Sequence, residues 1–162
     1  MNFDITKIAM AILYFLENDV KQLSERKVLA MLFLIDFNYF EKNGKFVFID
    51  DYIKEKRYVK SALLSEIFET IKLEKDIEGD ELEFLIKEFL EFIEIDIDKK
   101  ENHIDIKFQA IEKFDSEAFD EREFEILKEI TKTYKNSSNR NTLNALFSID
   151  KFREVEEEQH IF

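Results

Sequence analysis

The sequence predicts a mainly α-helical α+β fold, with about six helices and one small antiparallel β-hairpin near residues 93–108. Apolar residues recur at helical spacing over most of the 162 residues, and the chain has no proline and only two glycines to interrupt helices. Two short segments, 93–97 and 104–108, instead alternate strictly between apolar and polar residues, as half-buried strands do. This length is typical of one domain, so we expect residues 1–162 to form a single domain.

The first two helices are predicted from their caps and their apolar spacing. Asp4 is a suitable N-cap for a first helix that ends near Asn18. Ser24 is a suitable N-cap for a second helix that continues to about Lys42. Residues 28–35 of the second helix are apolar on every face, which is typical of a helix packed on all sides. We therefore expect the second helix to lie at the centre of the fold, with the aromatic residues around it in the core.

The middle of the chain is predicted to combine an irregular segment, two helices and the hairpin. Residues 45–60 lack helical spacing, although 46–49 resemble a short strand. A third helix is expected over 61–72, and a fourth from an Asp80 cap to Phe92. The hairpin follows, and its apolar residues are expected to face the core: Ile93, Ile95, Ile97, Ile104, Ile106 and Phe108.

The last third is predicted to hold a fifth helix and two shorter ones. Asp120 and Glu123 form a capping-box pattern at the start of the fifth helix. Residues 136–139, Asn-Ser-Ser-Asn, are the clearest loop in the chain. After this loop we expect a short helix over 140–147 and a charged helix from about Asp150.

The formal net charge of -13 belongs to the second half of the chain. Residues 1–75 contain 12 basic and 12 acidic residues, whereas 76–162 contain 12 basic and 25 acidic ones. Within that half, residues 76–98 hold ten acids against one lysine, and residues 131–153 are locally basic. The excess of acid argues against nucleic-acid binding, which needs a positive surface. The acidic run is interpreted as a solvated helix face or as a docking surface for a basic partner.

The composition excludes several classes of site. The chain has no cysteine, so disulfides, thiolate zinc sites and cysteine nucleophiles are excluded. His103 and His160 lack partners at metal-ligand spacing, and residues 76–80 carry their glycine too early for a calcium loop. No stretch approaches 18 uncharged apolar residues, and the apolar run 8–16 has no basic segment before it. We therefore expect no metal, no cofactor, no membrane span and no signal peptide, and a cytoplasmic protein.

One pattern on the hairpin suggests an enzyme. Asp96, Asp105 and Lys107 resemble the acid…acid-x-Lys arrangement of Mg²⁺-dependent nucleases, in which two carboxylates hold the metal and the lysine orients the attacking water. Asp105 and Lys107 share a strand face, opposite the isoleucines, that is expected to be solvated. The competing interpretation is that these residues simply form a solvated hairpin face. The nuclease hypothesis is kept as an alternative. We expect no catalytic residue.

The segment between the second and third helices supplies the candidate binding residues. Asp51, Tyr52, Arg57 and Tyr58 place aromatic side chains and opposite charges on a predicted loop. Tyrosine and arginine on loops are the residue types that anchor protein–protein contacts. These four residues are the candidates for partner binding, with ordinary loop packing as the competing interpretation.

Residues 26–45 resemble the signature helix of the Panacea, or SocA-like, antitoxin domain family. In that family a Lys-rich start leads into a Leu-Leu-Tyr-like run, an Asp-aromatic pair and a closing glycine. The counterparts here are Leu32-Phe33, Asp36-Phe37 and Gly44.

Two further elements extend the resemblance over most of the chain, from residue 5 to residue 155. Asp50-Asp51-Tyr52 matches the family's Asp-x-Tyr element, and residues 120–127 are similar to its acid-rich helix near the C-terminus. The chain departs from the family where a Gly-Pro-Val is usual, because it has Arg57-Tyr58-Val59 there.

The resemblance implies a bacterial antitoxin, often associated with phages or mobile elements, that neutralises a cognate toxin by direct binding. Its partner would be a toxin protein encoded by a neighbouring gene, and the domain would have no enzymatic activity. The alternative is a phage- or mobile-element-associated interaction protein of the same fold without toxin binding. The sequence leaves open whether the chain forms a homo-oligomer.

Overall fold

The computed structural model describes residues 3–48, 50–75 and 79–162, which are mainly helical and include two small antiparallel sheets. The α-helices are α1 (Ile5–Glu17), α2 (Glu25–Asn43), α3 (Ala62–Lys72), α4 (Asp80–Phe92), α5 (Glu121–Tyr134), α6 (Asn139–Leu146) and α7 (Asp150–Glu154), with a 3-10 turn, η1 (Ser116–Ala118), before α5. The strand pairs are β1 (Tyr52–Lys54) with β2 (Val59–Ser61), and β3 (Ile93–Lys99) with β4 (Ile104–Ala110). No helix in these ranges is long and apolar enough to cross a membrane.

The predicted class, a mainly helical α+β fold, is confirmed with two corrections. The described residues form seven α-helices instead of about six. They also form a second hairpin, β1–β2, inside the segment 45–60 that the sequence predicts to be irregular. Each of its strands has only three residues, which is too short for a recognisable alternation.

The prediction of a short strand at 46–49 is wrong for residues 46–48, which form no strand, and Ile49 lies outside the described residues. The backbone N–H groups of Val47 and Phe48 donate to the carboxylate of Asp36 instead of to a neighbouring strand. Both side chains are buried, so this stretch is fixed to α2 by a side chain and by packing.

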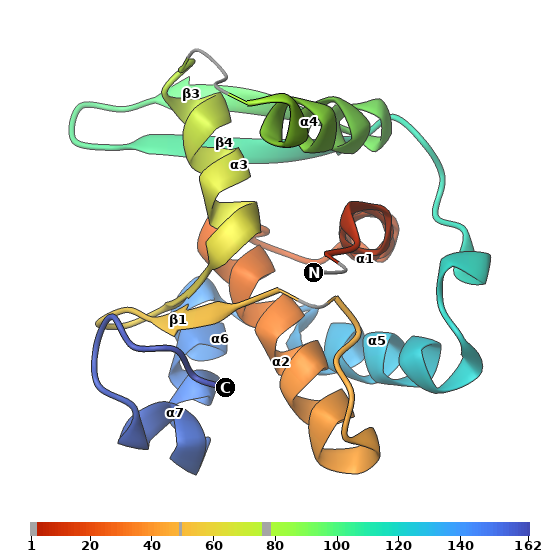
Figure 1. Cartoon of the computed structure of the whole chain (residues 1–162), viewed down its shortest axis with the longest axis vertical. Coiled ribbons are helices and arrows are strands. Elements are labelled where there is room, and N and C mark those ends of the chain that lie inside the picture. The colour runs from red at the N-terminus through yellow and green to blue at the C-terminus, as the bar shows by residue number, and fades with distance from the viewer. Residues whose placement is uncertain (1–2, 49, 76–78) are drawn as a thin grey trace.

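The second helix is the central one, as its sequence predicts (Figure 1). Every residue from Val28 to Ile35 is buried, and α2 packs against α1, α5 and α6. The Ser24 Oγ caps its start by accepting from the Lys27 N–H at 3.2 Å. The helix ends at Gly44, whose φ of 68° favours glycine.

The β3–β4 hairpin and α4 lie at one end of the molecule, and α5, α6 and α7 lie towards the other (Figure 1). The expected hairpin strands are confirmed, each with two further residues at its C-terminal end. Three of its apolar residues are buried: Ile93, Ile106 and Phe108. Three are partly exposed: Ile95, Ile97 and Ile104. The exposure increases towards the tip because the hairpin projects beyond α3 (Figure 1).

The predicted capping box at the start of α5 is confirmed. Asp120 Oδ1 accepts from the Glu123 N–H at 2.8 Å, and Glu123 Oε1 accepts from the Asp120 N–H at 2.9 Å. The second oxygen of Glu123 accepts from Lys7 Nζ at 2.7 Å. The same carboxylate therefore caps α5 and ties it to α1.

Candidate functional site

The β1–β2 hairpin carries the residues that the sequence predicts for partner binding. Asp51 is exposed just before β1, and Tyr52 is the first residue of β1. Arg57 and Tyr58 lie at the tip of the hairpin, which is closed by a 2.9 Å hydrogen bond from the Glu55 N–H to the Tyr58 carbonyl. Arg57 is exposed and Tyr58 is half-buried. The structure thus brings Arg57 and Tyr58 together and leaves Asp51 at the opposite end of β1.

Tyr52 is buried, so its side chain is not part of the surface around the hairpin. Its hydroxyl donates to Asp36 Oδ2 at 2.5 Å, and Asp36 Oδ1 accepts from the N–H groups of Val47 and Phe48 at 2.6 and 3.1 Å. Burial raises the pKa of Asp36 to about 6, against the opposing effect of these hydrogen bonds. Burial and the neighbouring Asp36 raise the pKa of Tyr52 well above its usual value, so the hydroxyl remains a donor. This pair fixes β1 to α2 from the inside.

Asp50 caps the helix that follows the hairpin. Its carboxylate accepts from the N–H groups of Leu63 and Leu64 at 3.2 and 3.3 Å, in the first turn of α3. The Ser61 side chain makes no capping bond, and its hydroxyl donates to Asp50 instead. A residue before β1 therefore supplies the cap for a helix after β2, and this closes the segment into a loop.

Replacing Asp50 by Ala is expected to lower the free energy of unfolding by about 1–2 kcal/mol, because the first turn of α3 loses its cap. Urea unfolding followed by far-UV circular dichroism measures the change. The matched control is Asp51→Ala, because the Asp51 carboxylate is exposed and its only described contact is His160 Nδ1 at 3.3 Å. Equal destabilisation by both variants would contradict the capping role.

Tyr58 is held in place by a cation. The guanidinium of Arg26, in the first turn of α2, lies 4.1 Å from the centroid of the Tyr58 ring. A cation over a tyrosine ring contributes roughly 0.5–1 kcal/mol at an exposed site. The contact therefore fixes the ring against α2 and fixes Arg26 beside the hairpin tip.

The start of α6 is fixed beside the start of α2 by two sets of polar contacts. Ser24 Oγ donates to Asn139 Oδ1 at 3.1 Å. Lys27 is fully buried, and its Nζ donates to the carbonyls of Lys21 and Ser137 at 2.5 and 2.6 Å. Burial lowers the pKa of Lys27, because the described groups around the ammonium are neutral carbonyls. These contacts bring α6 close to Arg26.

A cleft of about 810 Å³ lies between α6, the start of α2 and the β1–β2 tip. Four of its lining side chains are cationic and come from three separate elements: Arg26, Lys56, Arg57 and Arg140. One wall is a single face of α6, because the positions follow i, i+3, i+4 and i+7: Arg140, Leu143, Asn144 and Phe147. Among the described lining residues, Glu157 is the one acid. We call this the basic cleft.

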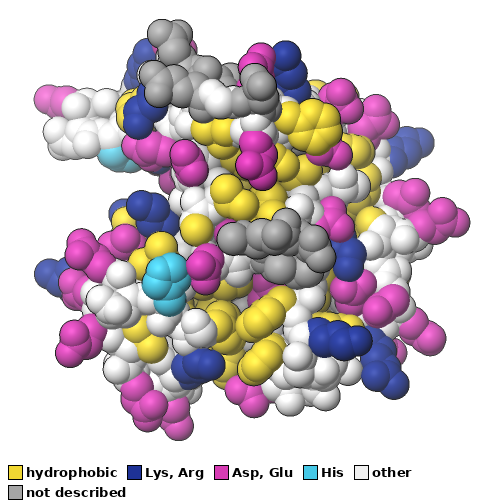
Figure 2. Space-filling model, in the orientation of Figure 1, with side chains coloured by type: hydrophobic (Ala, Val, Ile, Leu, Met, Phe, Trp, Pro, Cys, Tyr) yellow, Lys and Arg dark blue, Asp and Glu magenta, His cyan; other side chains and the backbone are white. Residues whose placement is uncertain are grey.

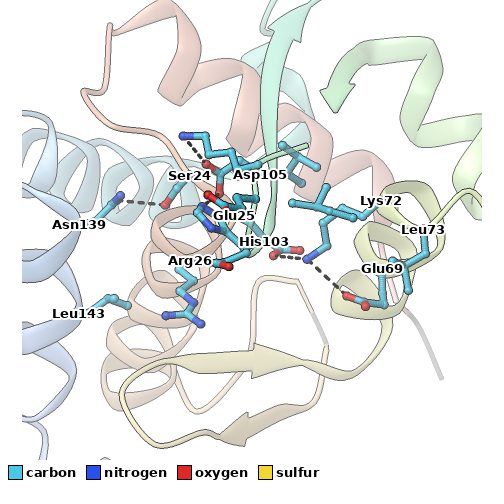
Figure 3. A pocket seen from close by; sticks show the side chains of 15 residues that line it. Ser24, Glu25, Arg26, Glu69, Lys72, Leu73, His103, Asp105, Asn139 and Leu143 are labelled. Carbon is cyan, nitrogen blue, oxygen red and sulfur yellow. Dashed lines mark hydrogen bonds and ion pairs between the residues drawn. The ribbon is translucent and has the colours of Figure 1, made fainter. Parts of the chain in front are cut away.

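A second hollow, of about 860 Å³, adjoins the basic cleft on the far side of Arg26 and differs in its charges. Lys72 Nζ, at the end of α3, pairs with Glu25 of α2 at 3.1 Å and with Glu69 of its own helix at 3.4 Å, and Figure 3 shows the Lys72–Glu25 pair connecting α3 to α2. Arg26 extends away from them, on the side of Leu143 (Figure 3). This hollow opens at the molecular edge beneath the projecting hairpin (Figure 2). Both of its lysines, Lys72 and Lys100, are paired with carboxylates, so they are less available to a charged ligand than the cations of the basic cleft.

The carboxylates of the β3–β4 hairpin are exposed or already paired. Asp96 lies opposite Lys107 and accepts from Gln109 Nε2. Asp105 pairs with Lys100 Nζ at 3.1 Å, and its pKa is lowered mainly by that hydrogen bond. His103 Nε2 lies 3.4 Å from Asp105 in the same turn. In the ranges that the structure covers, no three potential metal ligands cluster.

The acidic run 76–98 lies partly outside the described residues, and so does most of the calcium-loop-like segment 76–80. Its described part covers α4 and most of β3. On the outer face of α4, Phe84 is 64% exposed, next to Glu81 and Lys87 at helical spacing. Helix α4 lies beside the β3–β4 hairpin, whereas α6, which lines the basic cleft, lies towards the other end of the molecule (Figure 1).

Several residues of the basic cleft escape sequence reasoning. Arg26 and Arg140 are 114 positions apart, and only the fold brings them together. The available signal was weak: residues 131–153 are locally basic, and Arg140, Leu143 and Phe147 share a helical face. No protein-family model, no curated protein and no solved structure matches this chain.

Proposed function

We propose that this protein is an antitoxin-type binding module that neutralises a cognate toxin protein, encoded by a neighbouring gene, by direct contact with it. The observation that carries the proposal is the tip of the β1–β2 hairpin. It presents an exposed Arg57 and a half-exposed Tyr58 beside an open cleft. Arginine and tyrosine, together with tryptophan, are enriched among the residues that dominate protein–protein binding energy.

The tip is also held by contacts within the protein, which favours binding. Tyr58 is held by Arg26 on one side and by the backbone bond from Glu55 on the other. Below it, Lys54 is nearly buried, with its Nζ donating to the carbonyls of Arg153 and Val155 at 3.2 and 2.8 Å. A side chain that is ordered before binding loses less entropy on association.

The resemblance to Panacea-like antitoxins supports the proposal in a specific way. Asp36, Asp50 and Tyr52 match motif positions of that family, and each makes internal contacts that hold the hairpin in place. Arg57 and Tyr58, in contrast, stand where the family has Gly-Pro, and they lie at the tip. In our proposal, the shared residues maintain the loop and the divergent ones select the toxin.

Co-expression with the product of the adjacent reading frame tests the proposal. We expect the wild-type chain to restore growth and to co-purify with that product, whereas the double variant Arg57→Glu/Tyr58→Ala fails in both. Lys113→Glu is the matched control, because Lys113 is exposed in the loop between β4 and η1, away from the hairpin tip (Figure 1). Growth that is not rescued, together with the absence of a complex, would overturn the proposal.

The second candidate is an interaction protein of the same fold, associated with a phage or mobile element, that does not bind a toxin. The replacement of Gly-Pro by Arg57-Tyr58 favours it, because the tip then differs most from the family where binding would occur. Purification from native cells separates the two candidates. A bound partner that is not toxic when expressed alone would support this second function.

A further inference from the structure

We infer, on the basis of the proposed function, that the basic cleft binds an acidic segment of the partner protein that carries one aromatic or aliphatic anchor residue. The inference goes beyond partner binding as such, because it names the chemistry of the bound segment. The inference depends on the cations that line the cleft, on the apolar side chains of its α6 wall and on the strongly acidic charge of the whole chain.

The four cations that line the cleft carry charge that the described residues do not neutralise by an ion pair. In the described part of the chain, none of its four cationic side chains lies within ion-pair distance of a carboxylate. Arg140 stands in the first turn of α6, where the helix dipole already favours an anion. Lys54 adds a nearly buried ammonium 6.0 Å from the Phe147 ring, and the described groups that bond it are carbonyls. Positive charges held together in this way are favourable for a bound carboxylate.

The α6 wall of the cleft carries two apolar side chains beside its cation. Leu143 and Phe147 lie on the α6 face that lines it, and both are half-buried. The Phe147 ring packs edge-on against the buried Phe152 ring, with centroids 5.2 Å apart. An apolar side chain that enters between them would displace water from apolar surface, which stabilises by about 25 cal/mol per Å². The cleft is thus suited to an acidic segment with an apolar residue among its acids.

The surrounding charge argues for a peptide over a nucleic acid. The chain carries a net charge of -13, so a long polyanion would meet repulsion beyond the cleft. The cleft's volume of about 810 Å³ is within the range of pockets that hold a small ligand or a few side chains. A short acidic segment can use the local cations without contacting the rest of the surface.

A fluorescein-labelled peptide, Gly-Glu-Asp-Glu-Phe-Glu-Asp-Glu-Gly, is the probe for this site, with binding followed by fluorescence anisotropy. We expect saturable binding to the wild-type protein that weakens at higher salt. Arg140→Glu is expected to weaken it by at least about tenfold, because a repulsive charge replaces an attractive one. Lys113→Glu should change it by less than about twofold, since that charge lies outside the cleft. A peptide with Ala in place of Phe should bind several-fold more weakly.

Three outcomes would overturn the inference. They are equal binding by wild type and Arg140→Glu, binding of a labelled oligothymidylate as tight as that of the peptide, and self-association at the cleft. Sedimentation of wild type and Arg140→Glu without peptide detects the last, which would make the occupant a second copy of this chain. The co-expression assay separates this result from the proposed function. If Arg140→Glu still neutralises the toxin, the antitoxin role stands and the cleft inference fails. If the peptide binds the cleft but the wild-type chain neutralises no toxin, the cleft inference stands and the antitoxin role fails.

Discussion

Replacing Asp36 by Ala is expected to lower the free energy of unfolding at pH 7 by about 3–5 kcal/mol. The substitution removes the acceptor for three buried donors at once: the N–H groups of Val47 and Phe48 and the hydroxyl of Tyr52. All three residues are at most 2% exposed, so water cannot replace the carboxylate without opening the structure. Urea unfolding of the variant and the wild type measures the loss.

The same carboxylate makes stability depend on pH in a direction opposite to that of most native carboxylates. Because burial raises the pKa of Asp36 from 3.8 to about 6, the folded state binds this proton more tightly than the unfolded chain does. The stability that comes from binding this proton is therefore complete below pH 3.8 and is lost as the pH rises through 6, whereas the ionised carboxylate still accepts the three hydrogen bonds at pH 7. The shift corresponds to about 3 kcal/mol.

The matched variants for this prediction are Asp36→Asn and Tyr52→Phe. The Asn variant cannot titrate, so the difference in unfolding free energy between wild type and variant should shrink by about 2.4 kcal/mol from pH 4 to pH 7. The Phe variant removes a hydrogen bond that lowers the pKa of Asp36, so the transition should move to higher pH. A difference between wild type and Asp36→Asn that is constant over this range would contradict the raised pKa.

The helices were predictable from the sequence because their signals are local. The caps Asp4, Ser24 and Asp120 lie next to the helices that they start, and each side chain accepts the expected backbone hydrogen bond. The all-apolar stretch of α2 required a central position, and the strict alternation of β3 and β4 gave the long hairpin.

The β1–β2 hairpin was not predictable, because long-range contacts determine it. Tyr52 depends on Asp36, sixteen positions earlier, and β1 pairs with the C-terminal segment through a bridge between Ile53 and His160. The sequence therefore predicts the hairpin-tip residues Arg57, which is exposed, and Tyr58, which is half-buried, because they are adjacent in a loop. It does not predict that Tyr52 is buried, or that Arg140 lines the cleft beside them.

Deletion of residues 158–162 is expected to lower the free energy of unfolding by on the order of 4 kcal/mol. This segment runs along β1: the Glu158 N–H donates to the Lys54 carbonyl at 2.7 Å, and the Ile161 N–H donates to the Tyr52 carbonyl at 2.9 Å. Ile161 is 2% exposed, and Phe162 packs among a group of aromatic rings: Phe33, Phe37, Phe40, Phe46 and Tyr52. The lost burial and hydrogen bonds outweigh the chain entropy that the deletion releases.

The deletion should also loosen the hairpin tip, because β1 would be left with β2 as its only strand partner. Hydrogen exchange at the β1 amide of Lys54, which donates to the Gln159 carbonyl at 3.0 Å, is expected to become faster than the exchange of α2 amides. Gln159→Ala is the matched control, since its exposed side chain can be removed while the backbone bond remains, and its stability should stay within about 0.5 kcal/mol of wild type. If the deletion left the exchange at Lys54 unchanged, the C-terminal segment would not be what holds β1. If it increased exchange there while α2 stayed protected, the tip that carries Arg57 and Tyr58 would owe its rigidity to the last residues of the chain.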